Sequence, residues 1–107
     1  MSGRDLIKLP PDEREPALRA WLTERLARYL GRTDIAGDVM LAEYGIDSLV
    51  ALNLYGDVEE ELGLPVDVTV VLDYPTVDEL AAHLSQQAEE VGPETQSAEK
   101  SPERSRP

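Results

Sequence analysis

The feature that most constrains the fold is a series of apolar residues between Glu13 and Leu30 that recur every three or four positions. This spacing places them along one face of a helix. Proline is tolerated in the first turn of a helix and glycine often ends one, so we expect this helix to start between Asp12 and Pro16 and to stop at Gly31. The apolar face consists of Leu18, Trp21, Leu22, Leu26, Tyr29 and Leu30, with Trp21 assigned to the core.

A second helix is expected from about Ser48 to Leu62. Asp47 is a good N-cap, since its carboxylate can accept a hydrogen bond from a free amide of the first turn. Gly63 provides the stop at the other end. The predicted inward positions are Leu49, Leu52, Tyr55 or Gly56, Val58 or Glu59, and Leu62.

The segment from Val66 to Leu72 is rich in β-branched residues, which alone would favour a strand. The sequence offers no second strand to pair with it, so we predict a short helical turn over Val68–Asp73. A last helix follows Thr76, because Thr76 and Glu79 match a capping box. Its inward residues are Val77, Leu80, Ala81, Leu84 and Ala88.

The other segments complete a single all-α domain. Residues 1–11 contain Pro10 and Pro11 and predict an extended lead-in. Residues 92–107 are dominated by polar, charged and turn-forming residues and predict a disordered tail or linker. A chain of 107 residues fits one core. We therefore expect a four-helix bundle over residues 12–91, with three longer helices and a short third one. Its 32–47 loop is expected to be anchored by Ile35, Val39, Leu41 and Ile46.

Charge and residue types narrow the function classes. The formal net charge is -12, and the segment from Leu41 to Val91 contains twelve acids but no Lys or Arg. This surface repels nucleic acids and anionic membranes and favours partners with basic patches. The chain has no cysteine and one histidine, His83. A self-contained enzyme or metal site is therefore disfavoured, and a cytoplasmic protein without a membrane span is expected.

The stretch from Leu41 to Leu49 carries the chemistry. It places Ser48 at the first position of the second helix, directly after the cap Asp47 and just beyond Gly45, which can turn the chain sharply. At a helix N-terminus, free amides and the positive end of the helix dipole stabilise a phosphate group. The position suits a phosphodiester on the Ser48 hydroxyl.

These residues resemble a known family. The sequence from Gly45 to Leu49 is similar to the Gly-x-Asp-Ser-Leu signature of acyl carrier proteins, most like the carrier domains of polyketide synthases. The junction from Leu72 to Thr76 and the lead-in from Leu6 to Arg14 also resemble that family. The resemblance implies that Ser48 receives 4'-phosphopantetheine from coenzyme A. The chain would then tether acyl or polyketide intermediates as thioesters and present them to partner enzymes.

The resemblance also assigns roles to neighbouring residues. Asp47 matches the acid that the phosphopantetheinyl transferase recognises, and Leu49 matches the apolar anchor after the serine. The outer face of the second helix is the family's docking surface, here expected to include Leu52, Asp57, Glu59 and Glu60. The implied partners are the transferase and a ketosynthase, acyltransferase or acyl-adenylate ligase with basic docking patches. The carrier is expected to be a non-catalytic monomer without metal, nucleic acid or membrane partners.

Some positions depart from the family's pattern. Val50 and Asn53 stand where fatty acid synthesis carriers tend to have acids, and Gly56 lies in mid-helix at a cost of about 1 kcal/mol against alanine. These departures favour a dedicated biosynthetic pathway. Leu72 replaces a frequent phenylalanine and is interpreted as a core substitution.

Two alternatives to the acyl carrier stay open. A peptidyl carrier of a nonribosomal peptide synthetase has the same architecture, but a double glycine usually precedes its serine, and Tyr44–Asp47 lacks one. An acidic interaction module that is never modified is the other. The initial methionine favours a free-standing protein, whereas the lead-in and the charged tail favour a domain of a longer synthase.

Other conspicuous residues receive structural interpretations. His83 has no placed Asp, Cys or second His and is assigned no catalytic or metal role. Tyr44 and Tyr55 are assigned to the core rather than to an acyl groove. The run Glu59–Glu61 lacks the ligand spacing of a calcium loop.

Overall fold

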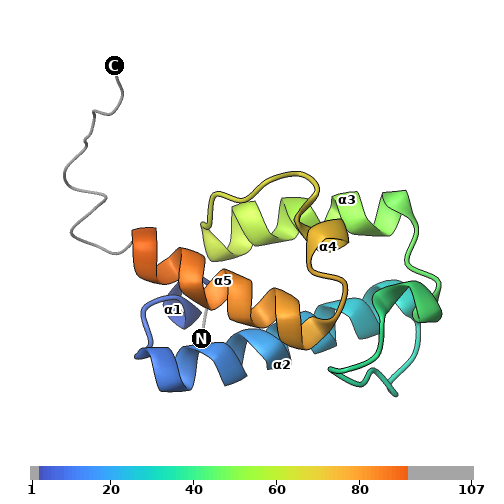
Figure 1. The fold of residues 1–107 in the computed structure, drawn as a ribbon, viewed down its shortest axis with the longest axis horizontal. Helices are drawn as coiled ribbons and strands as arrows, with labels where there is room; N and C mark the ends of the chain where they lie inside the picture. Colours follow the sequence, from blue (N-terminus) through green and yellow to red (C-terminus); the bar gives the residue numbers. More distant parts are fainter. Residues whose placement is uncertain (1–2, 92–107) are drawn as a thin grey trace.

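The computed structural model describes residues 3–91, which form an all-helical bundle (Figure 1). Its elements are α1 (Gly3–Leu6), α2 (Pro11–Leu30), a 3₁₀ turn (Leu41–Tyr44), α3 (Ser48–Asp57), a π-helical turn (Val58–Leu62), α4 (Val70–Asp73) and α5 (Val77–Val91). The predicted bundle of three longer helices and a short third one is confirmed. The predicted tail, residues 92–107, lies outside the described residues.

The first long helix starts earlier than expected. Pro10 is its cap and Pro11 its first residue, so that Pro16 lies inside the helix and beyond the first turn. Proline at this position removes the hydrogen bond to the carbonyl of Asp12. Pro16 and Asp12 are both exposed, so water can donate a hydrogen bond to the Asp12 carbonyl. The predicted end is confirmed, because Gly31 adopts the left-handed conformation with φ 67°.

The prediction of an extended lead-in is wrong for residues 3–6, which form the single turn α1. Leu6 and Ile7 pack against the core, and the guanidinium of Arg4 donates to the carbonyl oxygen of Glu60 at 3.3 Å. The restriction that a proline imposes reaches only the residue before it. Pro10 therefore could not exclude a helical turn at residues 3–6.

In α3, the predicted start at Ser48 is confirmed, but part of the predicted inward face is wrong. Leu49 and Leu52 are 65% and 51% exposed, whereas Ala51 and Leu54 are buried. The buried face continues through Val58 and Leu62 in the π-helical turn, as expected. The segment has two possible apolar helix faces, one with Leu49 and Leu52 and one with Ala51 and Leu54. The second is buried, because at helical spacing it continues to Leu62.

The predicted helical turn over Val68–Asp73 is confirmed in its second part, because α4 spans Val70–Asp73 and residues 68 and 69 form a turn before it. Val70 and Val71 point into the core, whereas Leu72 is 69% exposed. The interpretation of Leu72 as a core substitution is therefore wrong. A four-residue helix covers little more than one turn, so packing two adjacent valines inward leaves the following leucine outside.

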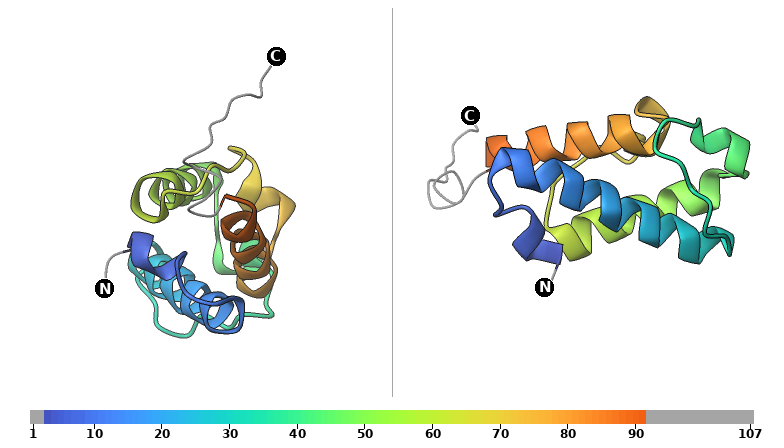
Figure 2. Two further views of the ribbon diagram at one scale, coloured as in Figure 1. Left: turned by 90° about the vertical axis from the view of Figure 1, so that its left-hand side faces the viewer. Right: turned by 90° about the horizontal axis from the view of Figure 1, so that it is seen from below.

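The predicted inward face of α5 is confirmed, and so is the part of the predicted capping box in which Thr76 accepts a hydrogen bond. The amide of Glu79 donates to the Thr76 hydroxyl oxygen at 3.1 Å. Seen end-on in Figure 2, α2, α3 and α5 enclose the core from three sides. Trp21 is only half-buried at the edge of the core, with the Arg25 guanidinium 4.8 Å above its ring. The fully buried large side chains are Leu18, Leu22, Leu26, Leu54, Val58, Leu62, Leu64, Val70, Val77, Leu80 and Leu84.

The loop between α2 and α3 is held by hydrogen bonds to other parts of the chain. The amide of Leu41 donates to the carbonyl of Pro75 at 2.7 Å, and the amide of Asp78 donates to the carbonyl of Gly37 at 3.0 Å. Leu41 is buried as expected, and Ile35 and Ile46 pack against the core. Val39 is partly exposed and is not among the residues packed there.

The bundle has two distinct ends. The 32–47 loop and the first turn of α3 lie at one end, which we call the serine end (Figures 1 and 2). Helix α1 and the last turn of α5 lie at the other end, which we call the α1 end. Ser48 is therefore far from both ends of the described chain.

Candidate functional site

Ser48 is the first residue of α3, and its side chain is exposed. Gly45, with φ 83°, turns the chain after the 3₁₀ turn, and Asp47 then adopts an extended conformation. The Oδ1 atom of Asp47 accepts a hydrogen bond from the amide of Val50 at 2.9 Å. Asp47 is thus the predicted N-cap, and its capping bond fixes the first turn of α3 beneath the Ser48 hydroxyl.

The surroundings of Ser48 combine an exposed hydroxyl with the positive end of a helix. Neither α3 nor α4 contains a Lys or Arg. Stabilisation of a phosphate by these two helices would therefore come from the first-turn amides and the dipole of α3, not from a cationic side chain. The position can accept a bulky, phosphate-linked group without rearranging the core.

One of the residues that line an apolar groove of about 190 Å³ is Ile46, two residues before Ser48 in the chain. The groove lies between the end of the 32–47 loop and α4, and it includes Ile46 and Leu72. The remaining lining residues are Leu41, Ala42, Val71 and Pro75. Leu72, which was expected in the core, therefore lines a groove at the same end of the molecule as Ser48.

The predicted docking residues fall into two groups. Leu52, Glu59 and Glu60 are exposed, as a docking surface requires. Asp57 is not a free contact, because its carboxylate lies 2.9 Å from Arg25 Nη1 and accepts a hydrogen bond from the Tyr29 hydroxyl. Desolvation and the bond to Asp57 raise the pKa of Tyr29. The expectation of Asp57 as a docking contact is therefore not supported, since this residue joins α3 to α2.

Arg25 is the residue that the sequence interpretation missed. It contacts Asp57 and forms two hydrogen bonds of 2.6 Å with the carboxylate of Glu61, which lowers the pKa of Glu61. Its position four residues after Trp21 on a predicted helix was visible in the sequence. The pairing was not visible, because it depends on how α2 lies against the π-helical turn.

The remaining singled-out residues have structural surroundings. The ring of His83 stacks on that of Tyr74 with centroids 4.0 Å apart. The Tyr44 ring packs against the core, and its hydroxyl accepts a hydrogen bond from the amide of Ala36 at 2.7 Å. Tyr55 is half-buried. Among residues 3–91, no group of three or more His, Cys, Asp or Glu is arranged to hold a metal ion.

The described helices also bear on membrane association. Over residues 3–91, none of them combines the length and the apolar character that a membrane-crossing helix needs.

Comparison with known sequences identifies the family. Residues 20–84 match the phosphopantetheine attachment site family. The conidial yellow pigment biosynthesis polyketide synthase of Emericella nidulans is 33% identical over 74 residues, which cover 69% of this chain and 3% of that protein. The pikromycin polyketide synthase component PikAIII of Streptomyces venezuelae is 36% identical over 82 residues, 74% of this chain and 5% of that protein. The chain thus spans a few hundredths of the length of these relatives.

Solved structures show the same fold. The A1-type ACP domain from module 5 of MLSA1 superposes with a TM-score of 0.71 at 27% identity, covering 84% of this chain and 93% of that one. A free-standing peptidyl carrier protein from Acinetobacter baumannii superposes with a TM-score of 0.65 at 31% identity, covering 68% and 94%. The chain belongs to the phosphopantetheine attachment site family and is an acyl carrier domain like those of polyketide synthases.

Proposed function

We propose that Ser48 is the residue that carries 4'-phosphopantetheine, and that the domain presents polyketide intermediates to synthase enzymes. The observation that carries this proposal is the exposed Ser48 hydroxyl at the first position of α3, directly after the capping Asp47. The family's cofactor requires a serine hydroxyl that a second protein can reach, and Ser48 meets that requirement. When bound, the cofactor supplies a thiol that holds an acyl group as a thioester.

The domain's own contribution is positional and non-catalytic. The cap from Asp47 holds the first turn of α3, whose free amides would stabilise the phosphodiester of a bound cofactor. The hydrogen bonds from Leu41 to Pro75 and from Asp78 to Gly37 hold the loop that leads into this turn. Tethering then raises the effective concentration of the acyl group at a partner's active site. The proposed domain covers residues 12–91, with α1 packed onto it.

The proposed partners follow from the same role. A phosphopantetheinyl transferase modifies Ser48, and a ketosynthase, acyltransferase or acyl-adenylate ligase loads or uses the acyl group. Because coenzyme A is the donor, we place the modification in the cytoplasm. Leu52, Glu59 and Glu60 are exposed on or just after α3 and are proposed docking contacts.

The peptidyl carrier is the second candidate. It is favoured by the likeness to the Acinetobacter baumannii peptidyl carrier protein. The absence of a double glycine before Ser48 and the polyketide synthase relatives favour an acyl carrier instead. Modified protein loaded by a polyketide acyltransferase, but not by an amino acid adenylation enzyme, would support the acyl carrier.

Intact-mass spectrometry tests the attachment residue. The protein is incubated with coenzyme A, magnesium and a broad-specificity phosphopantetheinyl transferase, beside a Ser48→Ala control. We expect one phosphopantetheinyl mass gain in the wild type and none in the control, which lacks the nucleophilic oxygen. A gain that persists in Ser48→Ala would place the cofactor elsewhere. The absence of any gain on folded wild-type protein would support an unmodified interaction module.

A further inference from the structure

The turn that leads into Ser48 has no packing at its centre. Gly45 has φ 83°, and a side chain at this position would meet no atom within 4 Å. Two hydrogen bonds close the first turn of α3, and both end on Asp47. The Ala51 amide donates to its carbonyl oxygen at 3.0 Å, and the Val50 amide donates to its Oδ1 atom at 2.9 Å. The position of Ser48 therefore depends on the residues that hold the chain beside Gly45.

Tyr44, the residue before Gly45, holds the chain on one side of this turn. Its ring is half-buried and packs against the core. Its hydroxyl oxygen accepts a hydrogen bond from the Ala36 amide at 2.7 Å, so the side chain reaches back across the loop. A single side chain therefore connects the core, the early part of the 32–47 loop and the residues just before Ser48.

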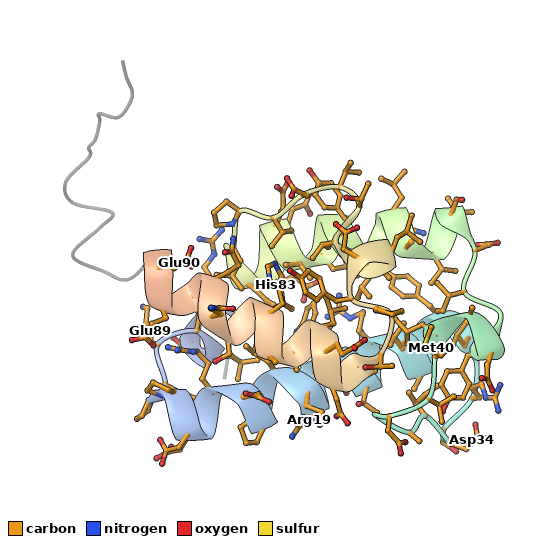
Figure 3. All side chains as sticks on the ribbon, in the orientation of Figure 1. Arg19, Asp34, Met40, His83, Glu89 and Glu90 are labelled. Atoms are coloured by element: carbon orange, nitrogen blue, oxygen red, sulfur yellow. The ribbon has the colours of Figure 1, made fainter. Side chains whose placement is uncertain are left out.

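Arg32 adds a second contact to the Tyr44 ring. Its guanidinium carbon lies 4.8 Å from the ring centroid, within the range of a cation–π interaction. Two hydrogen bonds of 2.6 and 2.7 Å to the carboxylate of Asp34 orient this guanidinium. Figure 3 shows Asp34 at the serine end of the bundle. We call Arg32, Asp34 and Tyr44 the loop anchor.

The loop anchor differs from the other contacts of this turn. Ile46, on the far side of Gly45, packs against the core through apolar atoms, and such packing has no preferred direction. The backbone hydrogen bond from Leu41 to Pro75 lies at the other end of the 3₁₀ turn. A hydrogen bond restricts both distance and angle. The Tyr44 hydroxyl therefore restricts the orientation of the turn directly at Gly45.

We propose that Tyr44 is a positioning residue for the modification of Ser48, and that Arg32 supports it. The inference rests on the proposed function, because it specifies how the chain presents that hydroxyl. Modification forms a bond from Ser48 Oγ to the phosphorus that carries pantetheine and breaks the bond from that phosphorus to the leaving adenosine 3',5'-bisphosphate. The serine proton moves to a base of the transferase. A displacement of about 1 Å can slow such a step about 100-fold, so the position of the first turn of α3 affects the rate.

Single-turnover kinetics test this proposal, with a broad-specificity phosphopantetheinyl transferase and the full chain. Varying the transferase concentration gives the maximum rate constant and the half-saturating concentration. Tyr44→Leu keeps an apolar side chain for the core but loses the ring and the hydroxyl. We expect its maximum rate constant to fall about five- to tenfold, because Ser48 is less well aligned. The half-saturating concentration should stay within about twofold of the wild-type value, because the proposed docking residues are unchanged.

Two milder variants divide the loop anchor into its parts. Tyr44→Phe removes only the hydroxyl, and Arg32→Gln removes the cation beside the ring. Each should lower the maximum rate constant about two- to threefold, less than Tyr44→Leu does. Neither variant removes a core contact of the ring, so both keep the proposal testable if Tyr44→Leu does not fold.

Tyr29→Phe is the matched control. Tyr29 is half-buried, and its hydroxyl donates to the carboxylate of Asp57. Asp57 lies nine residues after Ser48, which is about 14 Å along α3. Tyr29→Phe therefore removes a tyrosine hydrogen bond without touching the loop anchor, and its maximum rate constant should match that of wild type.

Amide hydrogen exchange measured by NMR gives a readout that needs no transferase. The Val50 amide, bonded to Asp47, should exchange about three- to fivefold faster in Tyr44→Leu than in wild type, because a looser turn releases the cap more often. In Tyr29→Phe it should exchange at the wild-type rate. A purely local role of Tyr44 in the core would leave the exchange of Val50 unchanged.

Two outcomes would overturn the inference. In one, Tyr44→Leu and Tyr44→Phe modify as fast as Tyr29→Phe, so Tyr44 does not position Ser48. In the other, the half-saturating concentration rises while the maximum rate constant is unchanged, so Tyr44 is a contact of the transferase. Circular dichroism at the assay temperature verifies that each variant is folded. Failure of the wild-type chain to be modified at all would instead overturn the proposed function, and this inference with it.

Discussion

The two ends of the bundle are held together by different interactions. At the α1 end, Arg14 is 6% exposed and connects α2 to the Leu9 carbonyl, Ser85 and Glu89. At the serine end, backbone hydrogen bonds join the 32–47 loop to the start of α5, and Asp47 caps α3. The serine end also has an ion pair, between Arg32 and Asp34, but that pair lies within the 32–47 loop and joins no two elements. An arginine side chain therefore bridges separate elements at the α1 end, whereas backbone hydrogen bonds do so at the serine end.

The largest expected effect tests the α1 end. Arg14→Met should lower the free energy of unfolding by about 2–3 kcal/mol, because the carbonyl of Leu9 and the buried Ser85 hydroxyl lose their partner. Urea unfolding followed by circular dichroism measures it. Arg28→Met is the matched control, since Arg28 is two-thirds exposed and lies 3.7 Å from Glu24. Its cost should stay below about 0.5 kcal/mol. Equal losses of unfolding free energy in Arg14→Met and Arg28→Met would show that the hydrogen bonds of Arg14 do not stabilise the α1 end.

The next effect tests the serine end through two glycines. A methyl group added at Gly45 or at Gly56 would meet no atom within 4 Å. Only Gly45 has a positive φ, 83°. Gly45→Ala should therefore cost about 1–2 kcal/mol, whereas Gly56→Ala should stabilise α3 by about 0.5–1 kcal/mol. Thermal and urea unfolding measure both changes. If Gly45→Ala and Gly56→Ala changed the free energy of unfolding in the same direction, the turn before Ser48 would not depend on the positive φ of Gly45.

Asp47 allows its structural and recognition roles to be separated. Asp47→Ala removes the acceptor for the Val50 amide and should cost about 1 kcal/mol. Asp47→Asn keeps an acceptor oxygen and should leave the unfolding free energy nearly unchanged. If the transferase recognises the charge, both variants lower the modification rate. A normal rate in Asp47→Asn would limit the role of Asp47 to capping.

Whether the sequence predicts a feature of this fold depends on how far apart in the chain the interacting residues lie. The start of α3, its cap and the αL glycine Gly31 are local features, and all were predicted correctly. The inward face of α3 was not, because Leu49–Leu52 and Ala51–Leu54 are equally helical patterns. Only packing against α2 and α4 decides between them. The exposure of Leu72 and the pairing of Asp57 with Arg25 depend on the same long-range packing.

The smallest expected effect concerns acid stability at the junction of α2 and the π-helical turn. Arg25 lowers the pKa of Glu61 in the folded state below its value in the unfolded chain, which is about 4.3. A lowered folded pKa gives stability that is present above the unfolded pKa and lost as the pH falls through the folded pKa. Since the Glu61 side chain is 44% exposed, this contribution should stay below about 1 kcal/mol.

Two isosteric variants isolate that contribution. Glu61→Gln should be slightly less stable than wild type at pH 7, and the difference should shrink towards pH 3 as the pH falls through the lowered folded-state pKa of Glu61. Glu60→Gln removes the neighbouring exposed carboxylate, which forms no ion pair within residues 3–91. It should therefore match wild type at both pH values, apart from a slight gain at pH 7 from reduced acidic repulsion. Urea midpoints at the two pH values measure the difference. A similar loss at pH 7 in both variants would mean that Arg25 does not bind Glu61 selectively, and the α2 contact would then rest on Asp57 alone.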